Sequence, residues 1–272
     1  MAAGAALVDA RDDGDGGGVA ELRVRGGRDA VRRALADAAS TLPAGQEVDV
    51  AVVPAAAREG RRLVVLDVDS TLITGEVVEM LAARAGVERE VARVTEAAMR
   101  GEVDFAGSLH RRVALLQGLP ATVLDDVLAE VVPSPGAATM ARSLAAAGVP
   151  VGVVSGGFAE VVEPLAASLG VPHAEANRLE VSGGHLTGRV LGDVVDAAAK
   201  KRFLRALAAR HDVPLAGTVA VGDGANDLDM VRAAGTGVAF CAKPVLAAAA
   251  DVVLARRDLT AVVHLVGAPL VP

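Results

Sequence analysis

Two aspartates, two positions apart, are the residues whose spacing first suggests chemistry. Asp67 and Asp69 follow Leu63–Leu66, four aliphatic residues that predict a strand buried on both faces. Side chains at i and i+2 of an extended chain project from the same face, so the two carboxylates would need a cation or a shared proton. Mg²⁺ prefers such oxygen ligands, while Ser70 and Thr71 add hydroxyl and amide groups suited to an anion. The alternative is a polar turn, in which Asp and Ser are common.

Two other predicted strands also end in polar residues. Val149–Val154 is followed by Ser155-Gly156-Gly157, and Gly217–Val221 is followed by Gly222-Asp223-Gly224-Ala225-Asn226-Asp227. In open α/β sheets, ligands bind outside the carboxyl ends of the strands. If the sheet is parallel, all three ends meet at one edge, which favours an active site over an ordinary turn at Asp67 and Asp69.

Lysine is rare in this chain, and Lys200 adds a fourth candidate group to the three strand ends. Among 27 basic residues, only Lys200, Lys201 and Lys243 are lysines, and lysine supplies a compact point charge where arginine supplies a planar fork. The alternative for Lys200 is a solvated residue on a helix surface. A carboxylate nucleophile, Mg²⁺, a hydroxyl-and-amide cradle and a lysine together form a site suited to phosphoryl transfer.

The predicted elements position these residues in an α/β fold. Alternating strands and helices after residue 148 imply a parallel, Rossmann-like core sheet flanked by helices, with the short strands Thr236–Phe240 and Asp251–Leu254 near its end. Ala174–Val181 and His185–Val190 flank a Ser-Gly-Gly turn and predict a hairpin. Between the first and second core strands, five segments have helical spacing and predict an inserted helical-bundle cap. These are Glu76–Ala85, Glu88–Met99, Phe105–Leu116, Ala121–Val131 and Gly136–Ala147.

The domain prediction follows from this pattern. Residues 1–18 end in a Gly- and Asp-rich run and predict a flexible tail. Residues 19–60 predict a small β-α-β segment and a linker, with strands Val19–Val24 and Val48–Val53 around a helix over Arg28–Leu42. The catalytic core is expected over 61–75 and 148–272, and the cap over 76–147.

Composition limits the functional class. Of the 272 residues 52% are hydrophobic, enough for a large core, but aromatic residues make up only 1%, so Ala, Val and Leu must build it. The net charge of −7 argues against nucleic-acid binding. Cys241 is the single cysteine, which excludes a disulfide within the chain and suits a reducing compartment. We found no secretion signal and no run long enough to span a bilayer, so we expect a soluble, cytoplasmic protein.

Together the four motifs resemble those of the haloacid dehalogenase superfamily. From Leu63 to the last helix, about three quarters of the chain, the sequence is similar to the phosphoserine phosphatases of that superfamily. The closer likeness rests on Asp67-Val-Asp-Ser-Thr-Leu-Ile, Glu76, Met99-Arg-Gly-Glu-Val-Asp-Phe105, Arg111-Arg112-Val113, Val154-Ser-Gly-Gly-Phe158, Gly192-Asp-Val-Val-Asp196 and Val221-Gly-Asp-Gly-Ala-Asn-Asp-Leu228.

The resemblance implies a reaction. A Mg²⁺-dependent enzyme would hydrolyse O-phospho-L-serine to serine and phosphate, the last step of serine biosynthesis, through an aspartyl phosphate. Asp67 would be the nucleophile, and Asp69 the general acid and then the base for water. The resemblance also implies the binding roles of the other residues. Ser155, Gly156 and Lys200 would hold the phosphoryl group, and Asn226 would orient phosphate or substrate. The metal ligands are expected to be Asp67, Asp69, Asp223 and Asp227.

In the cap, the resemblance implies that Glu76 meets the substrate ammonium and Arg112 its carboxylate. Met99 and Phe105 would line the pocket. Two alternatives remain at this stage: a related phosphatase or phosphotransferase acting on another small phosphate, and a non-catalytic regulatory subunit.

Residues 19–60 resemble the second half of an ACT domain, a ligand-sensing module. Because the first half is missing, a structural or dimerising remnant is favoured over amino-acid sensing. The predicted β-α-β unit has an open sheet edge, and open edges seek partners. We therefore expect a homodimer formed through this segment.

Overall fold

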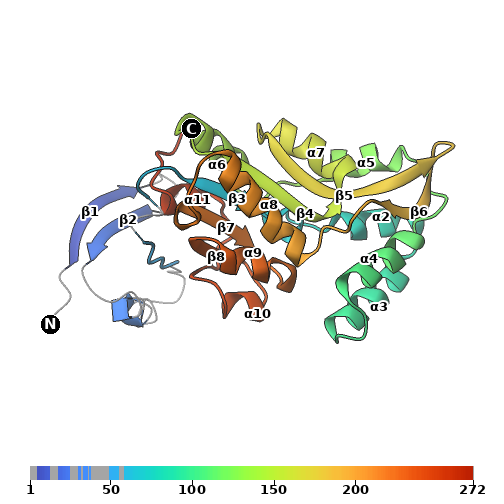
Figure 1. The fold of residues 1–272 in the computed structure, drawn as a ribbon, viewed down its shortest axis with the longest axis horizontal. Helices are drawn as coiled ribbons and strands as arrows, with labels where there is room; N and C mark the ends of the chain where they lie inside the picture. The colour runs from blue at the N-terminus through green and yellow to red at the C-terminus, as the bar shows by residue number, and fades with distance from the viewer. Residues whose placement is uncertain are drawn as a thin grey trace.

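The computed structural model describes residues 5–12, 18–24, 30–31, 33–35, 37, 49–54 and 58–271. In this part of the chain a seven-stranded sheet runs in the order β6-β5-β4-β3-β7-β8-β9 (Figure 1). Every neighbouring pair is parallel except the β5–β6 hairpin, which confirms the predicted α/β class. The strands are β3 (Leu63–Leu66), β4 (Val151–Phe158), β5 (His173–Ser182), β6 (His185–Leu191), β7 (Thr218–Gly222), β8 (Thr236–Phe240) and β9 (Val252–Leu254).

Strand β3 lies at the centre of the sheet and is buried on both faces, as its aliphatic run predicted. Val64 and Leu66 pack into one hydrophobic layer, and Leu63 and Val65 into the other, because successive side chains of a strand point to opposite faces. The first layer includes α6 (Ala137–Ala146), α7 (Ala159–Ser168) and α11 (Thr260–Leu265). The second includes α8 (Ala197–Arg210), α9 (Leu228–Ala233) and α10 (Pro244–Ala247).

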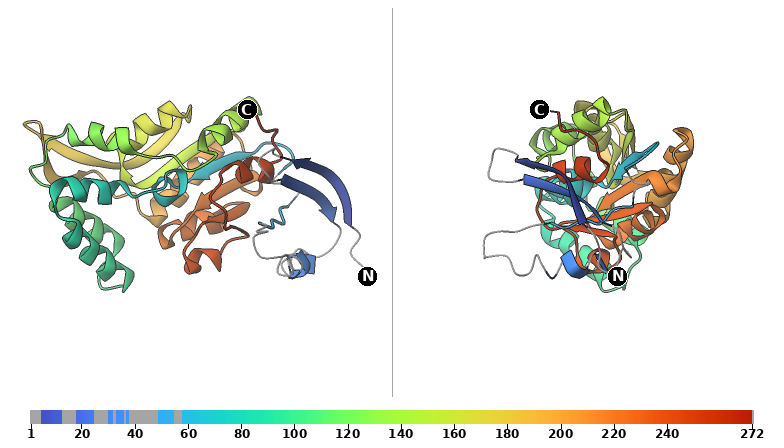
Figure 2. Two further views of the ribbon diagram at one scale, coloured as in Figure 1. Left: turned by 180° about the vertical axis from the view of Figure 1, so that it is seen from behind. Right: turned by 90° about the vertical axis from the view of Figure 1, so that its left-hand side faces the viewer.

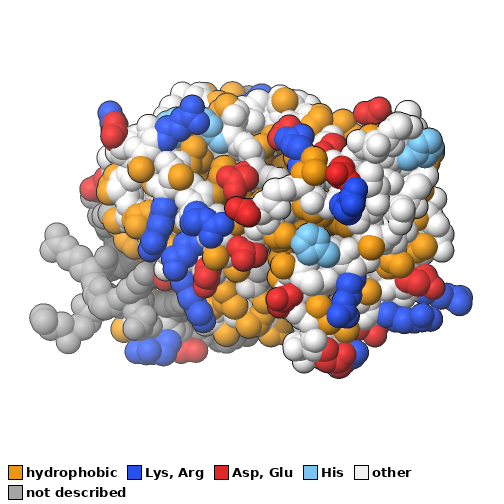
Figure 3. Space-filling view, turned by 45° about the vertical axis from the view of Figure 1, so that its right-hand side comes forward, with side chains coloured by type: hydrophobic (Ala, Val, Ile, Leu, Met, Phe, Trp, Pro, Cys, Tyr) orange, Lys and Arg blue, Asp and Glu red, His pale blue; other side chains and the backbone are white. Residues whose placement is uncertain are grey.

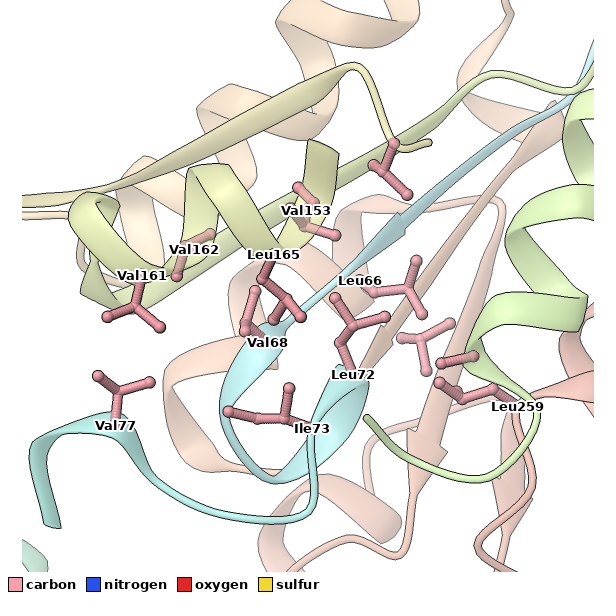
Figure 4. Close-up of a cluster of buried hydrophobic side chains, with 14 of the residues drawn as sticks. Leu66, Val68, Leu72, Ile73, Val77, Val153, Val161, Val162, Leu165 and Leu259 are labelled. Atoms are coloured by element: carbon pink, nitrogen blue, oxygen red, sulfur yellow. The ribbon is translucent and has the colours of Figure 1, made fainter. Parts of the chain in front are cut away.

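The turn after β3 is anchored by its own apolar residues. It forms a short helical segment, η2 (Val68–Leu72). Figure 4 shows Val68, Leu72 and Ile73 of this turn beside Val161, Val162 and Leu165 of α7. Because these side chains are buried, the polar residues between them are held at the sheet edge.

Four helices form the cap: α2 (Val77–Ala85), α3 (Glu88–Met99), α4 (Phe105–Ala114) and α5 (Val123–Glu130). The segments that enter and leave it run side by side, since Thr74 N donates to Val132 O at 3.0 Å and Ser134 N to Leu72 O at 2.8 Å. The β5–β6 hairpin also reaches the cap, where Leu186 N donates to Leu119 O at 2.8 Å. The cap is therefore tied to the core along both its connections and the hairpin.

The fifth predicted cap helix belongs to the core instead. Helix α6 packs against β4 and α11, so the cap ends near Pro133 and the boundary predicted at residue 147 is wrong. Helical spacing reveals an apolar face, but it does not tell which layer of the protein covers that face.

The N-terminal region differs from the prediction in two places. Residues of the expected flexible tail form β1 (Ala5–Asp12), which pairs antiparallel with β2 (Gly18–Val24); the tail prediction is wrong there, because pairing with β2 supplies hydrogen bonds that the local sequence does not reveal. The expected strand Val48–Val53 is wrong over residues 49–53, which form no strand, because an alternating pattern cannot show whether a partner strand lies in reach. Within the expected helix Arg28–Leu42, the described residues 30, 31, 33–35 and 37 are helical.

The cap and the β1–β2 hairpin lie at opposite ends of the molecule (Figures 1 and 2). Acidic and basic side chains are mixed on the face shown in Figure 3, so this face carries no charge of a single sign. Among the described residues, no helix has the length and apolar character needed to cross a membrane.

Candidate active site

Asp67 is the first residue after β3 and keeps the sheet's hydrogen bonding, since its N–H donates to Val221 O at 2.9 Å. The side chain is buried. Its Oδ1 accepts from Val68 N at 2.7 Å and lies 2.7 Å from Lys200 Nζ. Oδ2 accepts no hydrogen bond from the described residues, so one oxygen is fixed and the other is available for attack.

Lys200 lies in the first turn of α8 and is fully buried. Asp196 caps this helix by accepting from Ala199 N at 2.8 Å. The Lys200 ammonium bridges Asp67 and Asp227, at 2.7 Å from an oxygen of each. Burial alone would lower the pKa of Lys200, but these two carboxylates raise it above its ordinary value, so the group remains a cation at any physiological pH.

Asp67, Asp223 and Asp227 each offer one oxygen within 4.8 Å of the others. The second oxygen of Asp227 accepts from Asp223 N and Gly224 N, both at 3.1 Å, so the turn after β7 is folded around this carboxylate. Burial, and then the charge of Asp227, raise the pKa of both Asp67 and Asp223. Three carboxylates with one buried ammonium leave excess negative charge, and that donor set fits a hard divalent cation.

The Asp69 side chain lies outside this group. Its Oδ1 accepts from Val77 N at 2.9 Å, and its Oδ2 from Ser155 Oγ at 3.0 Å. The structure therefore does not bring the Asp69 carboxylate into the three-carboxylate cluster, although the sequence analysis counted it as a metal ligand. Burial raises the pKa of Asp69 against the effect of these hydrogen bonds, which favours a carboxyl group that carries a proton.

The last residues of β4 hold Ser155 in place; the strand continues to Phe158, beyond the predicted end at Val154. Gly157 N donates to Ser155 Oγ at 2.7 Å, and the pairing of β4 with β5 shifts register after Ser155. The shift leaves Gly156 O facing Asn177, whose Nδ2 donates to it at 2.9 Å, while Asn177 Oδ1 accepts from Val195 N at 2.8 Å. The sequence analysis did not identify Asn177. The signal that could have revealed it is an Asn within a predicted strand, where Asn is uncommon.

Two charged residues face the site from the cap side. Glu76 precedes α2, and its Oε1 accepts from Ser70 Oγ at 2.9 Å. Burial, and then the charge of Asp69, raise the pKa of Glu76 to about 7. Arg112 on α4 is half-buried; burial lowers its pKa, while the carboxylates of Glu76 and Asp69 oppose that change. The Arg112 guanidinium and the Glu76 carboxyl group therefore both interact electrostatically with Asp69.

The other predicted residues lie around this group. Phe105 begins α4, and its Cζ lies 2.8 Å from where a Cβ on Gly156 would stand, so the ring covers the end of β4. Asn226 lies half-buried in the turn η4 (Ala225–Asp227). Met99 ends α3, and its side chain lies outside the described part of the structure.

Lys243 is a further cation that the sequence analysis did not assign to the site. Its Nζ lies 3.9 Å from Asp223 Oδ2, and its side chain is 57% exposed. It therefore contributes positive charge at the solvent side of the carboxylate group.

Comparison with known proteins places this geometry in context. Residues 64–232 match the family described as haloacid dehalogenase-like hydrolase. A phosphoserine phosphatase of Streptomyces coelicolor is 56% identical over 238 residues, which are 87% of this chain and 57% of the relative. The chain thus spans little more than half of that relative's length. A phosphoserine phosphatase of Streptococcus thermophilus is 45% identical over 76% of this chain and 96% of its own.

A solved structure of a phospho-aspartyl intermediate analogue of phosphoserine phosphatase superposes with a TM-score of 0.71 at 41% identity. The match covers 76% of this chain and 99% of that one. The matched family model begins at residue 64, so the ACT-like character of residues 19–60 stays a prediction.

Proposed function

This chain belongs to the haloacid dehalogenase-like hydrolase family, and from that premise we propose that it is a Mg²⁺-dependent phosphoserine phosphatase. The observation that carries the chemistry is the Asp67 carboxylate, with Oδ1 held by Lys200 and Val68 N and Oδ2 left available. The names of the relatives and the charged pair of the cap support the choice of substrate.

In the first half-reaction, Asp67 Oδ2 attacks phosphorus and the bond from phosphorus to the serine oxygen breaks. The departing oxygen takes the proton from Asp69, whose burial favours the protonated form. The product is an aspartyl phosphate on Asp67, with free serine. Lys200, which contacts Asp67, and Ser155, which contacts Asp69, would donate to the phosphoryl oxygens.

In the second half-reaction, Asp69 is ionised and removes a proton from water. The water oxygen attacks phosphorus, and the bond between phosphorus and Asp67 breaks. Phosphate leaves, Asp67 is an anion again, and Asp69 has recovered its proton, so the cycle is balanced.

Asp67, Asp223 and Asp227 would hold the metal, because one oxygen of each lies within 4.8 Å of the others. The Lys200 ammonium alone does not neutralise these three carboxylates. A bound Mg²⁺ supplies positive charge that neutralises the phosphoryl oxygens and the nucleophile. Lys200 then keeps Asp67 and Asp227 at a fixed separation.

The cap distinguishes phosphoserine from other phosphate esters. Every competitor carries a phosphoryl group, so selection depends on the amino-acid end. The Arg112 guanidinium suits a carboxylate, and the Glu76 carboxylate suits an ammonium. Both groups lie close enough to Asp69 for its charge to act on them.

A panel of small phosphate esters, assayed for phosphate release with Mg²⁺, tests the proposal. O-phospho-L-serine should have the highest kcat/KM, above O-phospho-L-threonine, homoserine phosphate and p-nitrophenyl phosphate. A higher kcat/KM for another ester would assign the enzyme to a different small phosphate. Absence of phosphate release from every ester would contradict a phosphatase.

We also propose a homodimer formed through the N-terminal segment, and a cytoplasmic location. Among the described residues, the β1–β2 sheet has two strands, and sheets of that size need further pairing or packing. The single cysteine and the small charged substrate suit a reducing interior. Light scattering on the chain with and without residues 1–60 tests the dimer, since a shared oligomeric state would contradict it.

A further inference from the structure

Ser70, beside the catalytic Asp69, has a backbone conformation that non-glycine residues rarely adopt. Its φ is 58° and its ψ is −1°, in the left-handed region, and such residues persist where surrounding contacts hold them. All three polar groups of Ser70 are bonded. Its N donates to Gly75 O at 3.0 Å, its Oγ to Glu76 Oε1 at 2.9 Å, and its carbonyl accepts from Arg257 Nη1 at 2.9 Å.

Arg257 reaches Ser70 from a segment 187 residues later in the chain. It follows β9, the edge strand of the sheet. The guanidinium carbon lies 5.7 Å from the centre of the Phe240 ring, within the range of a cation–π contact. The side chain is partly buried, so a contact at each side fixes the guanidinium in one place.

The backbone of the same loop is held by the N-terminal segment. Asp49 Oδ1 accepts from Ala255 N at 2.8 Å, and its Oδ2 accepts from Arg256 N at 3.2 Å. Because β9 has no strand beyond it among the described residues, the loop has no sheet neighbour on that side. The carboxylate of Asp49 therefore accepts the hydrogen bonds of the two backbone N–H groups immediately before Arg257.

We propose that Arg257 is a positioning residue for substrate recognition. It holds Ser70 in the left-handed conformation, and the Ser70 hydroxyl in turn fixes the carboxylate of Glu76. Asp49 is the residue through which the N-terminal segment supports this arrangement. The role of Glu76 toward the substrate ammonium rests on the proposed function; the support of the turn by Arg257 and Asp49 does not.

Steady-state kinetics test the recognition step. Arg257→Gln should raise KM for O-phospho-L-serine on the order of tenfold, the usual effect of losing a charge-assisted hydrogen bond, with kcat within about twofold. KM for p-nitrophenyl phosphate, which has no ammonium, should change far less, and Arg257→Lys should recover part of the loss. The control is Arg256→Gln on the adjacent exposed residue, which should match the wild type. Equal kinetics for Arg257→Gln and Arg256→Gln would overturn the proposal, as would equal losses on both substrates.

Hydrogen–deuterium exchange tests the structural step without any substrate. In Arg257→Gln and in Asp49→Ala, the amides of residues 69–77 should exchange on the order of tenfold faster than in the wild type. Glu59→Ala, which removes an exposed carboxylate of the same segment, should leave them unchanged. Protection in α8 should be equal in all variants, which shows an intact core.

The two measurements separate this inference from the proposed function. If the wild type does not hydrolyse O-phospho-L-serine, the proposed substrate is wrong, and the exchange measurement still decides the role of Arg257 and Asp49. Exchange over 69–77 that is unaffected by both variants would overturn the inference even in an active phosphoserine phosphatase.

Discussion

At the residue scale, the site depends on how the buried Asp67 carboxylate and the half-buried Asp69 carboxylate are bonded. Asp67 shares its Oδ1 with Lys200 and Val68 N, whereas both oxygens of Asp69 accept hydrogen bonds from Val77 N and Ser155 Oγ. The first arrangement leaves an oxygen for attack, and the second orients a carboxyl group whose pKa is raised by burial. In the proposed mechanism, two aspartates only two positions apart therefore have different tasks, because their neighbours bond them differently.

Replacing the nucleophile tests the first task. Asp67→Asn keeps the shape of the side chain but removes the nucleophilic carboxylate anion, so kcat for phosphate release should fall roughly 10³-fold or more. The control is Asp229→Asn, a half-buried residue of α9 outside the carboxylate group, which should keep wild-type turnover. Near-normal turnover of Asp67→Asn would exclude the aspartyl-phosphate route.

The pH dependence of substrate binding tests Glu76. Its pKa is raised to about 7, so in the free enzyme the group is protonated below that pH and ionised above it. Only the ionised form attracts the substrate ammonium, so kcat/KM for O-phospho-L-serine should rise as pH increases through about 7. In Glu76→Gln this rise should disappear, while the titration of the substrate phosphate remains in both profiles. An identical profile for wild type and variant would show that Glu76 does not control binding.

At the element scale, three strand ends and one cap helix meet at a single edge. The end of β4 is packed so closely on Asp69 that a Cβ at Gly157 would lie 2.6 Å from its Oδ2 and 3.0 Å from Ser155 Oγ. The same edge is covered by Phe105 at the start of α4. Catalytic geometry therefore depends on small residues in β4 as much as on the charged ones.

Adding a methyl group at Gly157 should displace the Asp69 carboxyl group. Gly157→Ala should lower kcat about tenfold or more, because displacements of about 1 Å at reacting groups have effects of up to about 100-fold. KM should change less, since the cap residues proposed to bind the amino-acid end stay in place. The control is Gly75→Ala, where a Cβ would meet no atom within 4 Å. Equal kinetics in both variants would show that the end of β4 tolerates the extra atom.

The cap helix α4 should contribute substrate selectivity rather than chemistry. Arg112→Ala should lower kcat/KM for O-phospho-L-serine roughly 100-fold, because it would leave a buried substrate carboxylate unpaired. Hydrolysis of p-nitrophenyl phosphate should change far less, since that ester has no carboxylate. The control is the exposed neighbour, Arg111→Ala. Equal losses on both esters would mean that Arg112 supports the phosphoryl site or the fold.

At the scale of the whole molecule, metal binding and stability should be coupled. The cluster of Asp67, Asp223 and Asp227 places buried carboxylates close together at the carboxyl edge of the core sheet. A cation that binds only the folded state stabilises it by about 2.7 kcal/mol at 100 times its Kd. Saturating Mg²⁺ should therefore raise Tm by several degrees, as measured by differential scanning calorimetry.

Asp223→Asn should remove most of that rise, and chelation should abolish activity in the wild type. Ca²⁺ should also raise Tm but support little turnover, because it prefers more ligands and looser geometry. An unchanged Tm in saturating Mg²⁺, together with full activity after chelation, would contradict a metal site.

The sequence by itself determined the core fold and which polar residues gather at its edge. The aliphatic run of β3 is buried on both faces, and the polar residues after β3 and β7 meet Ser155, near the end of β4, at one edge of the sheet. These features are local: burial on both faces needs a continuous apolar run, and parallel strands must end at the same edge. The motif residues were identifiable because their chemistry is restricted to few residue types.

Only the tertiary structure decided which distant segments contact one another. It placed α6 in the core, formed β1 where a tail was expected, and took the Asp69 side chain out of the carboxylate cluster. It also brought Asn177 to Gly156 and Arg257 to Ser70, pairs separated by 21 and 187 residues. Local periodicity describes how a segment is built, whereas these contacts depend on how packed layers align side chains from remote parts of the chain, and no pattern within one segment encodes that alignment.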